Sequence, residues 1–394
     1  MAEREAEIAI IGAGPAGAHL ASKLAAAGCD AVLFDPKGAW EKPCGGGVPT
    51  RALREFQFIL ESADYPRKLI NRVTLISPLE RRVSLTLLRP FAIYSREVFN
   101  GMVLDRALAA GARFIRKSVV DSSREDRGWR IRTDDGETWS ARFLVGADGA
   151  ASATRRRLIG IFPKTDLALA FGYNVGTGDG DRDDEVVVRF PRNFTGYLWA
   201  FPRPGVMNFG VASKLGEKTS DQLRALLRDF IRDYYGGELP QPERMTFFGA
   251  KIPTLEAGSW KDLKSTGNGW ALVGDAAGFV DPITGEGIYY ALKSADLLAE
   301  ALLQTTESPN RYSIATADYS RRCREVFGKE LEKASQLLPR FYHGLFLGRI
   351  FTDATIRLAR YHRGVRGVLA DLIVGEQSYL NLKRDLLRQA YRVF

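Results

Sequence analysis

A glycine-rich turn near the N-terminus constrains the fold of this chain more than any other feature of its sequence. Residues 7–11 (Glu-Ile-Ala-Ile-Ile) are mostly apolar and predict a buried parallel strand, and residues 15–27 predict an alanine-rich helix. The turn between them contains Gly12, Gly14, Pro15, Ala16 and Gly17. Glycines at these positions permit a tight turn, let the backbone approach a pyrophosphate, and let helix and strand pack closely. The sequence therefore predicts a dinucleotide site at the helix N-terminus, where the helix dipole favours anions.

A second strand completes this βαβ unit. Residues 31–35 are mostly apolar and end at Asp35, 35 − 17 = 18 residues after Gly17. An acidic residue at this spacing accepts hydrogen bonds from the adenosine ribose hydroxyls of a dinucleotide. A lone glycine pattern is weak evidence, but strand, helix and acid together favour a dinucleotide-binding unit. They do not distinguish NAD from FAD.

A second pattern favours FAD. Residues 270–274 predict a buried strand that ends at Gly274 and Asp275, and a long helix is predicted from about residue 286 to 304. The segment that opens this helix contains Asp281, Pro282, Gly285, Gly287 and Ile288. A carboxylate at the strand end fits the ribityl chain of a flavin. The helix N-terminus fits the pyrimidine edge, where reduced flavin carries negative charge. Both aspartates also fit ordinary helix caps.

A third pattern follows the strand predicted at 143–146. It consists of Gly146, Ala147, Asp148 and Gly149, followed by Ser152 and Arg155. In a doubly wound sheet this strand end lies near the same pocket, although the pattern alone also fits a simple turn. Arg96, at the start of a predicted helix, is a candidate to reach the cofactor. A surface position is the more common arrangement for such an arginine.

Together these segments resemble the flavoprotein superfamily of p-hydroxybenzoate hydroxylase, and the resemblance extends over residues 5–305. Within that superfamily the sequence is more similar to the geranylgeranyl reductase family. Residues 42–48 (Lys-Pro-Cys-Gly-Gly-Gly-Val), which include Cys44, Gly45 and Gly46, resemble that family's cysteine–glycine loop beside the flavin.

A substrate motif of the same family, Tyr-x-Trp-x-Phe-Pro followed by Gly-x-Gly, is also matched. Tyr197, Trp199 and Phe201 precede Pro202, and Gly210 follows. Ala212 replaces the last glycine, a change that narrows the space near the backbone. At period two, the three aromatic rings lie on one face of a strand, which suits a long apolar ligand. The residues alone favour a sheet facing a core over a ligand site by two to one.

The resemblance implies an FAD-dependent reductase that saturates C=C bonds of a prenyl, geranylgeranyl-type chain by hydride transfer from N5 of reduced flavin. It implies catalytic roles for Cys44, Tyr197 and Trp199, and substrate contacts for Tyr197, Trp199, Phe201 and Gly210. The expected electron donor is NADPH or reduced ferredoxin. The chain has one dinucleotide fingerprint, which FAD is expected to occupy, so NADPH would bind transiently in the cleft or ferredoxin would donate at the surface. The prenyl substrate itself is not identified.

The predicted architecture is α/β plus α+β. A Rossmann-type FAD-binding domain (1–71, 92–165 and 265–305) is interleaved with an antiparallel-sheet substrate domain (72–91 and 166–264). Segments 72–77 and 82–88 are predicted to form a hairpin, and residues 113–120 a short strand. The remaining residues, 306–394, are predicted to be helical throughout.

Two other functions remain open. A flavin-dependent monooxygenase acting on an aromatic or carrier-bound substrate has the same FAD motifs. A halogenase is disfavoured because its Trp-x-Trp-x-Ile-Pro motif is not found. A flavoprotein that modifies a partner protein would use its basic C-terminal helices as the docking face.

Charge and composition limit the partners. The formal net charge of +9 favours anionic partners, but no nucleic-acid motif is present. Residues 340–394 hold ten Lys/Arg and four Asp/Glu, interspersed with Phe341, Tyr342, Leu345, Phe346, Leu347, Ile350 and Phe351. This pattern fits either peripheral contact with an anionic membrane or a helical lid over the substrate.

Cysteine and histidine content gives the remaining expectations. The three cysteines, Cys29, Cys44 and Cys323, and the three histidines lack metal-ligand spacing, so no metal site is expected. A charged N-terminus that leads into a strand predicts no secretory signal. The expected location is cytoplasmic.

Overall fold

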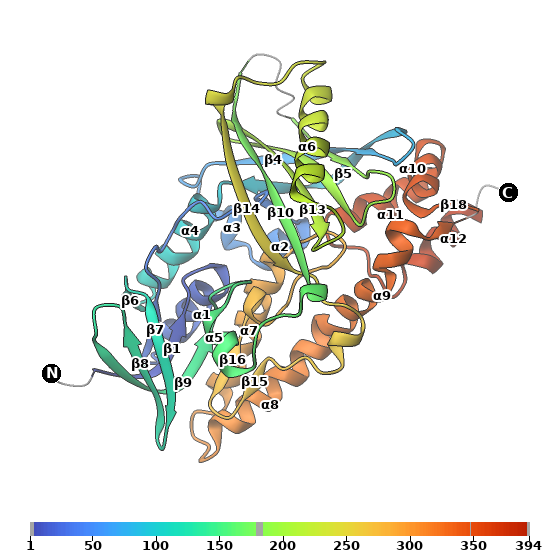
Figure 1. Ribbon diagram of the computed structural model, residues 1–394. Helices are drawn as coiled ribbons and strands as arrows, with labels where there is room; N and C mark the ends of the chain where they lie inside the picture. Colours follow the sequence, from blue (N-terminus) through green and yellow to red (C-terminus); the bar gives the residue numbers. More distant parts are fainter. Residues whose placement is uncertain (1–3, 179–183, 347, 392–394) are drawn as a thin grey trace.

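The computed structural model describes residues 4–178, 184–346 and 348–391, and two sheets organise it (Figure 1). Five strands of the first sheet are parallel, in the order β16 (Trp270–Leu272), β9 (Thr138–Gly146), β1 (Arg4–Ile11), β2 (Ala31–Phe34) and β6 (Arg113–Ile115). An antiparallel ribbon, β7 (Val119–Glu125) and β8 (Gly128–Thr133), joins β9, and β15 (Thr266–Gly267) joins β16. This is the doubly wound sheet that the glycine turn predicts.

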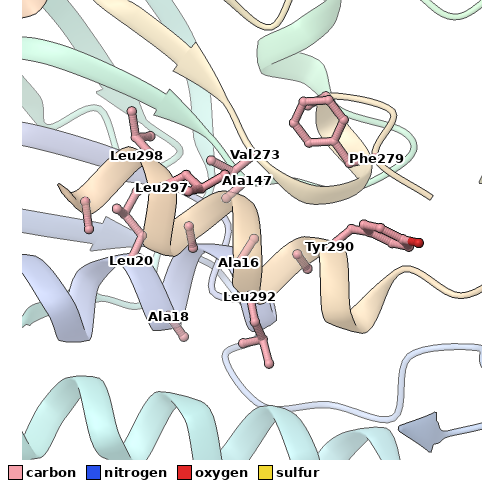
Figure 2. Packing of buried hydrophobic residues seen from close by; sticks show 14 of the residues in the cluster. Ala16, Ala18, Leu20, Ala147, Val273, Phe279, Tyr290, Leu292, Leu297 and Leu298 are labelled. Atoms are coloured by element: carbon pink, nitrogen blue, oxygen red, sulfur yellow. The ribbon is translucent and has the colours of Figure 1, made fainter. Parts of the chain in front are cut away.

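Small side chains bring the helices close to this sheet. Helix α1 (Pro15–Ala26) packs between α4 (Arg96–Ala109) and α7 (Ile288–Gln304). Figure 2 shows α1 and α7 side by side, with Ala16 and Leu20 of α1 near the buried leucines of α7. Gly274 has φ +56°, and a Cβ at this position would lie 3.2 Å from Cβ of Ala16. The alanine-rich sequence therefore allows close helix packing beneath the glycine turn.

The second sheet has the strand order β14 (Met245–Pro253), β10 (Leu167–Gly176), β13 (Val206–Lys214), β12 (Gly196–Arg203), β11 (Glu185–Arg189), β4 (Arg67–Ile76), β5 (Arg82–Tyr94) and β3 (Gly47–Val48). Its pairs are antiparallel except β4 with β11, which are parallel. The predicted hairpin at 72–77 and 82–88 is longer than expected, because pairing continues to Tyr94. Its register shifts between Ile70 and Arg72, where a β-bulge or irregularity interrupts the pairing.

One face of this sheet is covered by α6 (Ser220–Tyr234), whose Leu223, Leu227, Phe230 and Ile231 are buried against it. Its N-terminus is a capping box: Thr219 accepts from the N–H of Gln222, and the Gln222 side chain accepts from the N–H of Thr219. Shorter helices, α2 (Thr50–Glu55), α3 (Phe58–Glu61) and α5 (Ala153–Leu158), lie in the connections.

The C-terminal region begins with α8 (Arg311–Cys323) and α9 (Lys329–His343) and continues through α10 (Phe351–Tyr361), α11 (Arg363–Ile373) and α12 (Leu382–Tyr391). Helices α9 to α12 pack against β4 and β5 in one apolar cluster, along the right side of Figure 1. Buried Asp353 of α10 accepts from Ser77 (2.8 Å) and pairs with Arg81, which fixes the β4–β5 turn.

Two local predictions are wrong. The C-terminal region is not entirely helical, because β17 (Leu345–Phe346) and β18 (Arg349–Ile350) form a short hairpin. Gly344 directly precedes this hairpin, and Gly348 lies between its two strands with φ +72°, a conformation that interrupts a helix. The strand predicted at 113–120 is split into β6 and β7.

Among the described residues, no helix combines the length and apolar character needed to cross a membrane.

Candidate cofactor and substrate site

The glycine turn of residues 12–17 is shaped by the side chains it lacks. A Cβ on Gly12 would lie 2.5 Å from the Ala147 carbonyl oxygen, and one on Gly17 would lie 1.9 Å from the Gly12 carbonyl oxygen. A Cβ on Gly14 would meet nothing within 4 Å, and Gly14 begins α1 without a side-chain cap. Two glycines thus serve packing, while Gly14 leaves open space at an uncapped helix N-terminus. This arrangement fits the pyrophosphate of a dinucleotide.

Asp35 lies directly after β2 and holds the two connections next to it. Its Oδ2 accepts from the N–H of Ala13 (2.9 Å), and its Oδ1 accepts from the N–H groups of Lys37 (2.8 Å) and Gly38 (2.9 Å). The carboxylate is therefore fixed beside the glycine turn, in the place the sequence predicts for an adenosine ribose ligand.

Asp275 lies after β16 and pairs with a residue of the cysteine–glycine loop. Lys42 Nζ lies 2.9 Å from Asp275 Oδ2, and a Cβ on Gly287 would lie 3.1 Å from Asp275 Oδ1. Burial opposes ionisation of Asp275, but the charge and hydrogen bond of Lys42 and the charge of Arg96 together outweigh it, so the pKa of this carboxyl falls below its ordinary value. The second pattern and the cysteine–glycine loop therefore meet at an ionised carboxylate.

The segment before α7 folds into a tight loop around Asp281. Asp281 Oδ1 accepts from the N–H groups of Ile283 (2.8 Å) and Thr284 (3.1 Å), which is the cap-like role that the sequence left open. Gly285 has φ +70°, and Gly287 precedes the first helical residue, Ile288. Residues 281–287 are called the α7 loop below.

Asp148 stabilises the third pattern from within. Its carboxylate accepts from Ser152 Oγ and from the N–H (2.9 Å) and Oγ1 (3.0 Å) of Thr154, so it holds the turn that begins α5. Arg155 Nη1 lies 3.4 Å from the Ala276 carbonyl oxygen, next to Asp275. The third pattern thus adjoins the second, and a direct contact of Asp148 with FAD stays a prediction.

Arg203 and Glu41 organise the cysteine–glycine loop, and neither was predicted from the sequence. Buried Arg203 donates to the carbonyl oxygens of Cys44 and Gly45 (3.2 Å to Gly45) and pairs with Glu41 (2.8 Å). Glu41 also accepts from Ser95 and from the N–H of Arg96, at the start of α4. Their positions next to motif residues could have identified them: Glu41 directly precedes Lys42 of the cysteine–glycine loop, and Arg203 directly follows Pro202 of the substrate motif.

Arg96 is buried, so its interpretation as a surface residue is wrong. Its side chain is 5% exposed, Nη2 lies 3.3 Å from Asn100 Oδ1, and Nε has no hydrogen-bond partner among the described residues. Glu41, directly before the cysteine–glycine loop, lies against the first turn of α4, where it accepts from Ser95 and from the N–H of Arg96. A buried arginine with an unpaired N–H is suited to an acceptor on a bound group.

Cys44 is half-buried beside this arginine. The N–H of Gly46 points at its Sγ (3.3 Å). Burial alone would raise the pKa of the Cys44 thiol, but the charge and hydrogen bond of Arg96, the Gly46 N–H and the charge of Arg203 together outweigh burial and lower this pKa below its ordinary value. Cys44 is therefore more acidic than an ordinary thiol.

The aromatic residues of β12 form a row on the face opposite α6. Ring centroids of Tyr197 and Trp199 are 5.8 Å apart, and those of Trp199 and Phe201 are 6.4 Å apart. Gly210 lies opposite Trp199 in the neighbouring strand, and a Cβ there would lie 2.0 Å from the indole ring. A Cβ on Gly45 would lie 2.9 Å from the Phe201 ring. The row therefore contacts the cysteine–glycine loop.

Tyr197 connects this row to the α7 loop. Its hydroxyl donates to the Thr284 carbonyl oxygen, and a Cβ on Gly285 would lie 3.3 Å from the hydroxyl oxygen. Burial, with the nearby charge of Asp281, raises the pKa of Tyr197 well above its ordinary value. A cavity of about 30 Å³ adjoins Tyr197 and lies between Ala212, Ile283, Leu338 and Tyr342.

The structure thus gathers most predicted site residues around one region. The cysteine–glycine loop contacts both Asp275 and the aromatic row, and Tyr197 reaches the α7 loop, which includes Pro282, Gly285 and Gly287. The glycine turn and Asp35 lie at the carboxyl ends of β1 and β2, in the same sheet as Asp275.

Comparison with known proteins agrees with this geometry. Residues 5–173 match the family model described as FAD binding domain. Geranylgeranyl diphosphate reductase of Rhodobacter capsulatus is 30% identical over 356 residues, which cover 85% of this chain and 84% of that protein. A solved geranylgeranyl bacteriochlorophyll reductase-like protein of Thermoplasma acidophilum has a TM-score of 0.80 at 20% identity, covering 98% of this chain and 100% of that one.

Monooxygenases share the fold as well. The Pseudomonas aeruginosa protein PqsL, described as a probable FAD-dependent monooxygenase, superposes with a TM-score of 0.66 at 19% identity and covers 90% of this chain and 100% of its own. At such identities the likeness concerns the fold alone. The sequence relationship is more specific, and by it the chain belongs to the geranylgeranyl reductase family of FAD-dependent oxidoreductases.

Proposed function

We propose that the protein saturates C=C bonds of a geranylgeranyl-type prenyl chain that lies along Tyr197, Trp199 and Phe201. The observation that carries the proposal is the meeting of this aromatic row with the two loops assigned to the flavin. Phe201 packs against Gly45 of the cysteine–glycine loop, and Tyr197 hydrogen-bonds Thr284 of the α7 loop. The aromatic row therefore contacts both loops between which we place the flavin ring.

FAD would be held by three groups of residues. The glycine turn would take the pyrophosphate and Asp35 the adenosine ribose, while Asp275 would take the ribityl chain. The flavin ring would lie between the cysteine–glycine loop and the α7 loop, next to Ile288. Asp148 and Arg96 are included as residues near the ring, and the unpaired Nε of buried Arg96 supports its inclusion. When bound and reduced, FAD supplies the hydride.

The chain's own residues would make alkene reduction feasible. An isolated alkene accepts hydride only as a proton reaches the other carbon and a tertiary cation develops. The faces of Trp199 and Tyr197 would stabilise that cation, and the surrounding apolar residues would exclude water that captures it. Gly210 would keep the Trp199 ring in place by leaving room for it.

Cys44 Sγ is the proton donor we favour over Tyr197. The Tyr197 proton is donated to Thr284 and its pKa is raised, whereas the Cys44 pKa is lowered. We expect Cys44→Ala to retain the flavin spectrum and flavin reduction but to lose about 100-fold in alkene turnover, a typical contribution of a general acid. Activity of the unchanged protein should fall as pH rises through a pKa below the ordinary thiol value. Unchanged alkene turnover in Cys44→Ala would exclude this role.

The electron donor is proposed to be NADPH, bound transiently in the cleft, or reduced ferredoxin at the surface. Anaerobic titration with each donor, followed by flavin absorbance, distinguishes them. Reduction by NADPH alone at a saturable rate supports the first, and reduction only when ferredoxin is present supports the second.

Peripheral membrane contact is proposed for the C-terminal hairpin and α10. Leu345 is 73% exposed and Tyr361 is 72% exposed; exposed Arg349 lies on the other strand of the same hairpin as Leu345, and exposed Arg360 directly precedes Tyr361. Phe341 and Tyr342 are buried, so they belong to the protein interior and not to a lipid-facing surface. Flotation with anionic vesicles should recover the protein, and less of it after Leu345→Glu. Absence of flotation would favour a helical lid.

The experiment that tests the proposed reaction is anaerobic. The protein is loaded with FAD, reduced, and mixed with geranylgeranyl diphosphate, while flavin absorbance and product mass are followed. Flavin reoxidation with a gain of two hydrogens per double bond is the expected result. Flavin that reoxidises only when oxygen enters would contradict prenyl reduction and favour the monooxygenase alternative, which the fold shared with PqsL supports.

A further inference from the structure

Two tyrosines of the C-terminal region reach the α7 loop from outside the FAD-binding sheet. The hydroxyl of Tyr379, in the segment between α11 and α12, donates to Asp281 Oδ2 at 2.7 Å. The hydroxyl of Tyr342, on α9, donates to the Ile283 carbonyl oxygen at 2.9 Å. Both side chains are buried in the apolar cluster that joins α9–α12 to β4 and β5.

Tyr379 is itself held in position by α9. Its N–H donates to Glu330 Oε2 at 2.8 Å, and the hydroxyl of Ser378 donates to the other oxygen of the same carboxylate. Glu330 lies in the first turn of α9, and Leu338 and Tyr342 of that helix contact the second sheet. The position of the Tyr379 hydroxyl is therefore set by the packing of the C-terminal helices.

Asp281 connects Tyr379 to the proposed site by hydrogen bonds. One oxygen of its carboxylate accepts from Tyr379, and the other accepts from the N–H groups of Ile283 and Thr284. The carbonyl oxygen of Thr284 in turn accepts from Tyr197, the first ring of the aromatic row. A continuous set of hydrogen bonds thus runs from α9 to the proposed substrate face.

We propose that Tyr379 and Tyr342 are positioning residues that hold the α7 loop in the conformation that binds FAD. The proposal rests on the placement of the flavin against this loop. Asp281 is 6% exposed, and a buried carboxylate depends on each donor it has, because water cannot replace one. Burial also raises the pKa of Asp281, so loss of the Tyr379 donor favours the protonated carboxyl, which accepts the two loop amides less well.

The matched test compares Tyr379→Phe with Tyr312→Phe. Tyr312 of α8 also donates its hydroxyl to a carboxylate, Glu7 Oε1, but at 3.3 Å and in the middle of β1, outside the α7 loop. In Tyr379→Phe apoprotein, amide hydrogen exchange of Ile283 and Thr284 should accelerate about 10-fold. FAD affinity, measured by flavin fluorescence, should also fall about 10-fold. Both magnitudes are those expected for loss of a hydrogen bond to a charged group. Neither quantity should change in Tyr312→Phe.

Equal exchange rates and equal FAD affinity in the two variants would overturn the proposal. If Tyr379→Phe does not fold, Tyr342→Phe replaces it, because it removes only the bond to the Ile283 carbonyl and should weaken FAD binding about 3-fold, in line with a neutral hydrogen bond. Unchanged FAD affinity in that variant would likewise overturn the role of Tyr342. None of these measurements uses a prenyl substrate, so failure of the proposed reaction and failure of the positioning role are separable.

Discussion

The glycine turn and the aromatic row bound the same proposed site and are built in opposite ways. In the turn, contacts are made by backbone, and Gly12 and Gly17 leave room where a Cβ would lie 2.5 Å or less from a carbonyl oxygen. In the row, contacts are made by the large side chains of one strand, β12, and Gly210 and Gly45 from two distant segments leave room for those rings.

The difference has a physical basis in what each side would bind. A pyrophosphate is recognised by backbone N–H groups at a helix N-terminus, which requires close approach and few side chains. A long apolar chain is recognised by area and shape, which requires side chains. The first kind of site depends on local sequence, and the second depends on how distant strands are brought together.

The largest expected effect distinguishes the two glycines that are needed for packing, Gly12 and Gly17, from Gly14, whose Cβ position is open. Gly17→Ala places a Cβ 1.9 Å from the Gly12 carbonyl oxygen, and we expect a loss of at least about 4 kcal/mol of unfolding free energy. Gly14→Ala meets nothing within 4 Å, so it should keep the stability of the apoprotein while binding FAD at least about 10-fold more weakly. Urea unfolding and flavin fluorescence measure these. Equal stability of both variants would contradict a turn shaped by packing.

Arg203→Met tests whether a charged side chain holds the cysteine–glycine loop, on the side of the site opposite the glycine turn. It leaves Glu41 without its buried partner and frees the carbonyl oxygens of Cys44 and Gly45, so we expect a loss of about 3 kcal/mol of unfolding free energy. Arg224→Met, which removes an exposed ion pair with Asp221 on α6, is the control and should cost less than about 0.5 kcal/mol. Similar losses in both would show that Arg203 has no special role.

Gly210→Ala tests the aromatic row alone. The new Cβ would lie 2.0 Å from the Trp199 ring, which would have to move, at about 2 kcal/mol of overpacking. FAD affinity should be retained while prenyl turnover falls. Gly176→Ala, at the end of β10 with nothing within 4 Å of its Cβ, is the matched control. Loss of FAD affinity in Gly210→Ala would mean that the two sides of the site are not independent.

An effect of similar size to that of Gly210→Ala concerns pH. Burial raises the pKa of Glu286 from 4.5 to about 8, so the folded protein holds a proton that the unfolded chain releases above pH 4.5. Stability from this group is present at low pH and is lost as pH rises toward 8. Between pH 6 and 8 the unfolding free energy of the apoprotein should fall about 2 kcal/mol more than that of Glu286→Gln. Parallel pH profiles of the two proteins would contradict this.

Features that depend on neighbouring residues were predictable from the sequence. The glycine turn, the first βαβ unit and the period-two aromatic strand are local patterns, and all are found where they were expected. The parallel pairing of β4 with β11 was not predictable, because it joins segments whose sequences carry no sign of one another. The hairpin at 345–350 was missed because two-residue strands have no periodicity.

Within the site, the same distinction applies to individual residues. Asp275 and Cys44 lie in recognisable motifs. Arg203 and Glu41 act through an ion pair between residues 162 positions apart, and buried Arg96 donates its N–H to Glu41, a contact that the sequence does not indicate. Tyr379 reaches Asp281 from the last helices of the chain. Such contacts arise from tertiary packing, which local patterns do not encode.

The interleaving of the two sheets determines when each can be completed during synthesis. The first sheet includes β16, so its strand beside β9 is missing until Leu272 has left the ribosome. By then every strand of the second sheet has been made, since the last of them, β14, ends at Pro253. The domain that begins the polypeptide is therefore the second to have all its strands, and the edge of β9 stays open for pairing while the other sheet forms.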